Sequence, residues 1–244
     1  MNKIVLIFLF FISTLSHSKS QNQIIISSAI SLKEVVDELV IEYKRENPND
    51  NIEFLTNFGA SGSLRMQIEN GAPVDIVMFA DTKNVNKLKE QDIIASDDII
   101  QVIYNSITLI GYKPLNNIGE LNGKLIALGQ PELVPLGDYS KEYLENVGLF
   151  EDIKTNIIFT KDAKAVFNYV EQGEVDYGII YGNEIKNLKN SKIILELDND
   201  KYTKPKYSFA ILKENKNLTN EKFFKFLQSN QAKIIYTKNG FKIL

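Results

Sequence analysis

The sequence contains no cysteine, and its only histidine is His17. Without cysteine the chain can form no disulfide, no thiolate metal site and no lipid-anchored cysteine. His17 lies in a segment that we expect to be removed, so the mature chain has neither residue type. This excludes histidine-based catalytic triads, histidine general bases and ordinary zinc or copper sites. The remaining enzyme chemistries require paired carboxylates, a Ser–Lys pair or a tyrosine.

Arginine is also scarce, and acidic residues outnumber basic ones. Arg45 and Arg65 are the only arginines, and without Lys3 and Lys19 the chain has 26 basic and 31 acidic residues, a net charge of about −5. An acidic chain of this kind is unsuited to binding nucleic acid. Its overall charge would not attract a small anion either. A site for such an anion must therefore rely on local dipoles.

The first 20 residues have the composition of a secretory signal. Lys3 supplies a positive charge, residues 4–15 form an apolar run too short to cross a bilayer as a helix, and Ser16, Ser18 and Ser20 are suited to cleavage. We predict cleavage after Ser18 or Ser20 and a free, soluble protein in the periplasm. The short apolar run disfavours the alternative of an uncleaved anchor.

Apolar runs and amphipathic helices alternate over residues 24–88. Ser31 and Glu34 form a capping box before a helix whose apolar residues follow helical spacing, namely Leu32, Val35, Val36, Leu39, Val40 and Tyr43. Repeated β–α units predict parallel strands with helices on both faces of the sheet. Ligands of such sheets bind beyond the carboxyl ends of the strands, where Ser31 and Ser61 lie.

The apolar stretch Ile99–Tyr112 is interrupted at residues 104–106. We interpret it as one strand that leaves a first lobe and another that enters a second. The β–α pattern then restarts, and a strand at residues 207–212 is expected to return to the first lobe. The sequence therefore predicts an α/β protein of two Rossmann-like lobes with mainly parallel sheets joined by two hinge strands.

In this interpretation lobe I comprises residues 21–104 and 207–244, and lobe II, residues 105–206, is inserted into it. Such a layout leaves a cleft that can close on a ligand.

The turn Asn57–Ser63, with the sequence NFGASGS, stands between a predicted strand and a predicted helix. A turn of small residues at a helix start leaves backbone N–H groups uncovered, and these favour negative charge. The turn lacks the lysine of a P-loop, and no GxGxxG motif follows the first strand, so nucleotide phosphates are not favoured. Each residue also has a structural explanation, because Ser31 could cap a helix and Ser61 could form the turn.

Four motifs taken in order resemble the periplasmic molybdate-binding proteins of molybdate ABC transporters. They are SAISLKE, NFGASGSLRMQIENGAPVDIVMFAD, GQPELVPLGDYSKEYLENVG and TKDAKAVFNYVEQGEVDYGIIYG, and together they cover nearly the whole mature chain. The resemblance implies the fold of type II periplasmic binding proteins.

The resemblance also implies five contacts to the oxyanion, from the hydroxyls of Ser31, Ser61 and Tyr181 and the backbone N–H groups of Leu136 and Ala163. Molybdate is fully deprotonated near neutral pH and offers only acceptors, so a site made of donors suits it. The resemblance implies no catalytic residue, no cofactor and no metal site other than one for the molybdenum of the ligand.

Two charged residues adjoin these motifs. Arg65 stands where the family commonly has a small residue, and we expect it on the solvated surface of a helix. Asp162 is expected to be the acid at a helix N-terminus. Leu136, where the family often has a smaller residue, is expected to contribute only its backbone.

We therefore expect a monomeric, non-enzymatic periplasmic protein that captures molybdate or tungstate and presents it to the permease of an ABC importer. The first alternative keeps the fold and changes the ligand to sulfate or another small anion, which the sequence separates poorly from molybdate. The second is a secreted hydrolase that uses Asp81, Asp162 or Tyr181. It is less favoured because the sequence offers no convincing carboxylate pair.

Overall fold

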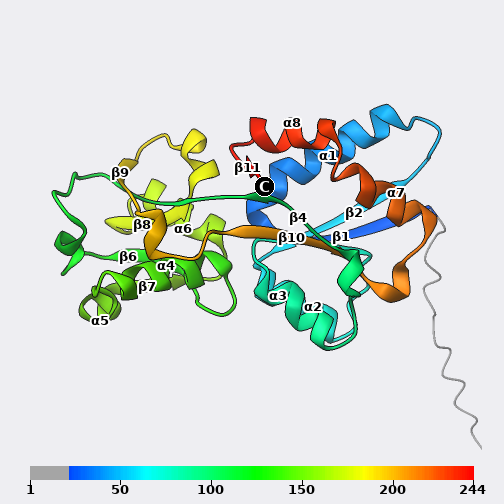
Figure 1. Ribbon diagram of the computed structural model, residues 1–244. Coiled ribbons are helices and arrows are strands. Elements are labelled where there is room, and N and C mark those ends of the chain that lie inside the picture. Colours follow the sequence, from blue (N-terminus) through cyan, green and yellow to red (C-terminus); the bar gives the residue numbers. More distant parts are fainter. Residues whose placement is uncertain (1–21) are drawn as a thin grey trace, which may run out of the picture.

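The computed structural model describes residues 22–244, so the expected signal segment lies outside the described residues. Two α/β lobes lie side by side, and two segments of the chain cross between them (Figure 1). Lobe I contains a six-stranded sheet and lobe II a five-stranded sheet. The prediction of an α/β fold with two lobes and two hinge strands is confirmed.

The sheet of lobe I has the strand order β11-β4-β10-β3-β1-β2. Its strands are β1 (Gln23–Ala29), β2 (Glu53–Gly59), β3 (Ile76–Phe79), β4 (Ile99–Tyr104), β10 (Lys206–Ile211) and β11 (Lys242–Ile243). β1 pairs in parallel with β2 and β3, whereas β10 is antiparallel to both β3 and β4. The returning strand β10 therefore joins the two halves of this sheet.

Helices cover both faces of this sheet. They are α1 (Lys33–Glu46), α2 (Ser61–Glu69), α3 (Lys83–Glu90), α7 (Leu218–Phe226) and α8 (Asn230–Lys238). α1 packs against α8 above the sheet in Figure 1, and α2 packs against α3 below it. The predicted apolar stripe of α1 is confirmed, because Val35, Val36, Leu39 and Tyr43 are buried.

Lobe II repeats this plan on a smaller scale. Its strands are β5 (Ile107–Gly111), β6 (Ile126–Gly129), β7 (Ile157–Thr160), β8 (Tyr177–Tyr181) and β9 (Lys192–Glu196), in the order β7-β6-β8-β5-β9. Its helices are α4 (Pro135–Asn146), α5 (Phe150–Ile153) and α6 (Ala163–Glu171). In the chain, α4 follows β6 and α6 follows β7, so both helices begin after strands of the same sheet. Both helices also pack on β6.

Both sheets are mixed, whereas we predicted mainly parallel sheets. β6 is parallel to β7 and β8, but β5 is antiparallel to β8 and β9. The reason is the double crossing between lobes, because a strand that leaves a lobe and a strand that returns to it run in opposite directions when they pair. The two crossings are joined by a 2.9 Å hydrogen bond from the Asn105 amide to the Pro205 carbonyl.

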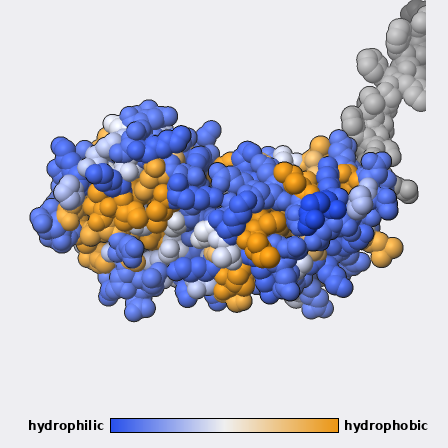
Figure 2. All heavy atoms as spheres, turned by 90° about the horizontal axis from the view of Figure 1, so that it is seen from above, coloured by the Kyte–Doolittle hydropathy of each residue, from blue (hydrophilic) through white to orange (hydrophobic). Residues whose placement is uncertain are grey.

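On the face seen in Figure 2, hydrophilic residues predominate and hydrophobic residues gather in separate patches over both lobes. Within residues 22–244, no helix has the length and apolar character needed to cross a membrane.

Candidate functional site

Ser31 lies in a short 3-10 helix, Ile30–Leu32, between β1 and α1. The predicted capping box is wrong, because Leu32 is the N-cap of α1 and no side chain caps that helix. The 3-10 turn separates Ser31 from the first turn of α1 and leaves its hydroxyl for another partner. That partner is Tyr207 on β10, whose hydroxyl oxygen lies 3.2 Å from Ser31 Oγ.

Ser61 is the first residue of α2 and is fully buried. Its Oγ accepts a 3.0 Å hydrogen bond from the amide of Ala80, just beyond β3. A hydroxyl that accepts in this way keeps its own proton for a further acceptor. Ser61 is therefore more than a turn former, since it connects the start of α2 to the end of a neighbouring strand.

Leu136 and Ala163 stand at the N-termini of two helices of lobe II. Leu136 follows Pro135, the first residue of α4, and Ala163 is the first residue of α6. Backbone N–H groups in the first turn of a helix have no acceptor within the helix, and they favour anions. Asp162 is the N-cap of α6, where Oδ1 accepts a 2.8 Å bond from Ala165, so its predicted role is confirmed.

Tyr181 ends β8 and is 1% exposed. Its hydroxyl is buried and has no hydrogen-bond partner among the described residues. The ring of Tyr207 is nearby, with the two centroids 5.9 Å apart, yet no hydrogen bond of ordinary geometry joins the two hydroxyls. Burial, and then the nearby Tyr207, Tyr139 and Asp81, raise the pKa of Tyr181 well above its usual value. Tyr181 therefore remains a proton donor.

The structure adds two tyrosines that we did not predict. Tyr139, on the first turns of α4, donates a 3.3 Å bond to the Ala80 carbonyl in the other lobe. Tyr207 is the second residue of β10 and is fully buried beside Ser31. The position of Tyr207 at the start of the predicted return strand is the signal that could have identified it.

Arg65 is not on the solvated surface, which corrects our expectation. Its side chain is only 13% exposed and forms an ion pair with Glu69 and a 2.9 Å hydrogen bond with Asn84 Oδ1. Asn84 in turn donates to both carboxylate oxygens of Asp81, one through its amide and one through Nδ2. Burial raises the pKa of Asp81 despite these bonds. Arg65 therefore supports the segment behind the site.

The structure brings the predicted residues to facing surfaces of the two lobes. The 3-10 helix that carries Ser31 contacts α6, which begins at Ala163. Gly62, next to Ser61, donates a 2.9 Å bond to the carbonyl of Leu133, shortly before α4. A cavity of about 80 Å3 between the lobes is lined by Ser31 but not by the other four predicted residues.

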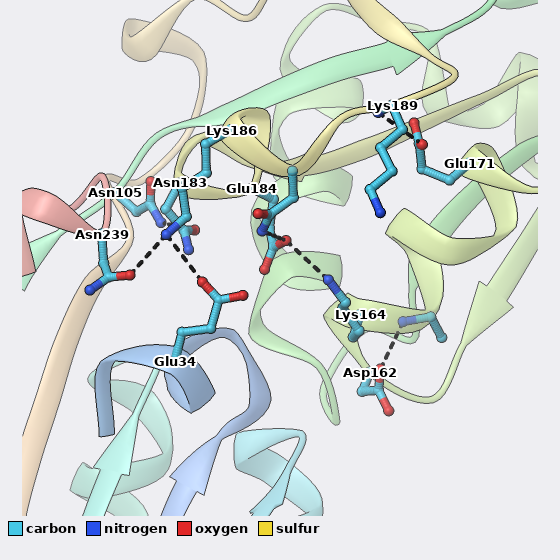
Figure 3. A network of polar contacts seen from close by, with 12 residues as sticks. Glu34, Asn105, Asp162, Lys164, Glu171, Asn183, Glu184, Lys186, Lys189 and Asn239 are labelled. Atoms are coloured by element: carbon cyan, nitrogen blue, oxygen red, sulfur yellow. Dashed lines mark hydrogen bonds and ion pairs between the residues drawn. The ribbon is translucent and has the colours of Figure 1, made fainter. Parts of the chain in front are cut away.

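Side-chain contacts also close the lobes on each other. Lys186 of lobe II bonds to two residues of lobe I, Glu34 at 3.1 Å and Asn239 at 2.8 Å (Figure 3). Lys83 and Asp138 form another interlobe ion pair at 3.0 Å. In the part of the chain that the structure describes, no three residues of the types His, Cys, Asp or Glu are grouped as a metal site. The facing surfaces therefore carry charged side chains as well as the hydroxyl and amide donors described above.

The two lobes, their mixed sheets and the donors on both sides of the cleft between them give the chain the fold of type II periplasmic binding proteins. The chain belongs to the family described as bacterial extracellular solute-binding proteins, whose model matches residues 24–242.

Individual relatives extend over nearly the whole chain. A putative ABC transporter substrate-binding lipoprotein of Bacillus subtilis is 32% identical over 92% of this chain and 88% of its own. The molybdate-binding protein ModA of Escherichia coli is 27% identical over 91% of this chain and 90% of its own. A solved substrate-binding domain of a putative molybdenum ABC transporter from Clostridium difficile is 32% identical. It covers 91% of this chain and 99% of its own, with a TM-score of 0.70.

Proposed function

We propose that this protein captures molybdate or tungstate in its cleft and presents the closed form to the permease of an ABC importer. The observation that carries the proposal is the Tyr181 hydroxyl, which is fully buried and has no partner among residues 22–244. Buried polar groups in proteins almost always form hydrogen bonds, so an acceptor supplied by a ligand suits this position.

The other proposed contacts are donors of the same kind. Ser31 and Ser61 contribute hydroxyls, and Leu136 and Ala163 contribute amides at helix N-termini. A dianion that carries no proton can accept from all five, and each hydrogen bond to a charged group contributes roughly 1.5–3 kcal/mol. None of the five is a cation, so these contacts hold the anion through local dipoles.

The relatives support this choice of ligand and partner. Those from Escherichia coli and Clostridium difficile are named for molybdate and for a molybdenum ABC transporter, and that from Bacillus subtilis for an ABC transporter. We further propose a monomer without enzymatic activity, exported to the periplasm by a cleaved signal. The Bacillus relative is named a lipoprotein, but this chain has no cysteine to carry a lipid.

The alternative ligand is sulfate, because it is also a tetrahedral dianion that only accepts hydrogen bonds. A hydrolase is disfavoured because both candidate carboxylates, those of Asp81 and Asp162, already have partners within the protein. Asp81 is bonded to Asn84 through both oxygens, and Asp162 caps α6.

Thermal unfolding with molybdate, tungstate, sulfate and phosphate tests the proposal. A ligand at a hundred times its Kd stabilises the folded state by about 2.7 kcal/mol, which raises the melting temperature measurably. We expect shifts with molybdate and tungstate and none with sulfate. A shift with sulfate alone would identify sulfate, not molybdate, as the ligand. The absence of a shift with all four anions would contradict oxyanion binding.

A further inference from the structure

Tyr207 connects the hinge to the proposed site. It is fully buried at the start of β10, and its hydroxyl oxygen lies 3.2 Å from Ser31 Oγ. Burial raises its pKa strongly, while contacts with Ser31 and with the side chain of Asn105 act in the opposite direction. Tyr207 thus stays protonated and stands between a hinge residue and a proposed ligand residue.

The side-chain amide of Asn105 has a defined orientation. Its Oδ1 accepts a 2.9 Å bond from the backbone amide of Ser106, which can only donate. Its Nδ2 therefore lies on the other side, where it donates a 2.8 Å bond to Asn183 Oδ1; Figure 3 shows these two side chains together. These two bonds hold the Asn105 side chain in place where the chain crosses between the lobes.

Burial decides the direction of the bond between the two hydroxyls. Either Ser31 or Tyr207 could be its donor. Tyr207 is fully buried, so its hydroxyl proton needs an acceptor within the protein, and Ser31 Oγ at 3.2 Å is that acceptor. Ser31 then keeps its own proton, which is free for an acceptor in the cleft.

We propose that Tyr207 is a positioning residue that makes Ser31 act as a donor towards the bound anion. This inference rests on the proposed oxyanion site. The order of donors runs from Tyr207 through Ser31 to the anion. Such an order favours an oxyanion without protons over one that carries a proton, because a protonated oxygen would meet another donor at Ser31.

A double-mutant cycle measured by calorimetry tests whether Tyr207 acts through Ser31. Loss of one directed hydrogen bond is worth about a factor of ten in affinity. We therefore expect Tyr207→Phe to weaken molybdate binding about tenfold in the parent, and less than about twofold in the Ser31→Ala background. We also expect Tyr207→Phe to reduce the preference for molybdate over phosphate, a change that lost packing alone would not produce.

Tyr236→Phe is the matched control. Its hydroxyl is also buried, and it donates a 2.9 Å bond to the Leu227 carbonyl within lobe I, away from the hinge. We expect this variant to bind molybdate as the parent does.

The outcomes separate this inference from the proposed function. If the parent binds none of the oxyanions, the proposed function fails and the inference fails with it. If the parent binds molybdate but Tyr207→Phe causes no loss, or the same loss in both backgrounds, only the role of Tyr207 is overturned.

Discussion

The amide nitrogen of Gly62 in lobe I lies 2.9 Å from the carbonyl oxygen of Leu133 in lobe II. The turn that carries Ser61 is thus also a point where the two lobes meet. A residue with a side chain does not fit there, since a Cβ on Gly62 would lie 2.7 Å from that oxygen and 2.8 Å from the carbonyl oxygen of Glu132. The contact between the lobes therefore requires a residue without a side chain at position 62.

We predict that Gly62→Ala weakens molybdate binding at least tenfold while leaving lobe I folded. The added methyl group meets backbone atoms of the opposite lobe, so the lobes must stay further apart. Calorimetry gives the affinity, and small-angle scattering with molybdate shows whether the lobes close.

Gly59→Ala in the same turn is the control, because its Cβ would meet only the movable side chain of Leu64, at 3.3 Å. Equal affinities for the parent and Gly62→Ala would show that the contact is dispensable.

Ser61→Ala should weaken molybdate binding about tenfold or more and also lower the stability of the free protein. The stability loss arises because the Ala80 amide loses its acceptor in a buried place, at a cost of about 1–3 kcal/mol. Calorimetry and chemical unfolding measure the two effects separately. Ser63→Ala, two residues along the same helix and partly exposed, should change neither quantity much. Unchanged affinity in Ser61→Ala would show that Ser61 does not bind the ligand.

The ion pair of Lys186 with Glu34 should slow the opening of the lobes. Lys186→Met removes an interlobe contact whose side chains are 40% and 60% exposed, so we expect only a two- to threefold faster release of molybdate at low salt. The difference should vanish at high salt because exposed charges are screened. Stopped-flow release measures it.

Lys222→Met provides the comparison, because Lys222 pairs with Asp50 within lobe I at 2.6 Å. Release as fast in this control as in Lys186→Met would argue against an interlobe effect.

Glu171 should make the protein sensitive to acid. Burial alone would raise its pKa, but hydrogen bonds from Ser191, Asn190 and Lys189 lower it from 4.5 to about 2. Because the pKa is lower in the folded state, these bonds stabilise the protein above pH 4.5, and their contribution is lost as the pH falls towards 2.

We expect the loss to reach roughly 2 kcal/mol after allowance for solvent screening. Urea unfolding between pH 6 and pH 2.5 should therefore show a smaller pH dependence in Glu171→Gln than in the parent. Glu174→Gln, a change at an exposed position close by, should keep the dependence of the parent. Identical pH dependence in Glu171→Gln and the parent would contradict the assignment.

Local features were predictable from the sequence because they depend on near neighbours. The stripe of α1 follows from helical spacing, and Asp162 as an N-cap follows from the residues just after it. The interruption at residues 104–106 marked the place where β4 ends and β5 begins. The capping box failed because the sequence pattern of Ser31 and Glu34 is also compatible with a 3-10 turn, and the chain takes that turn directly after β1.

Contacts across the hinge were not predictable in the same way. Ser31 and Tyr207 are 176 residues apart, and they meet only because β10 returns between β3 and β4. Periodicity identifies a strand but not its neighbours in the sheet or their direction. The burial of Arg65 likewise depends on Asn84, 19 residues away, which the pattern of α2 does not reveal.

The place of β10 in its sheet also sets the order in which the lobes can fold. β10 separates β3 from β4, so the sheet of lobe I stays incomplete until residues 206–211 have emerged. All strands of the other sheet, β5 to β9, lie within residues 107–196. A chain that is made or exported from its N-terminus therefore has a complete lobe II first. We expect the first-made segment to fold last, which reverses the usual order in which an N-terminal unit folds before the units that follow it.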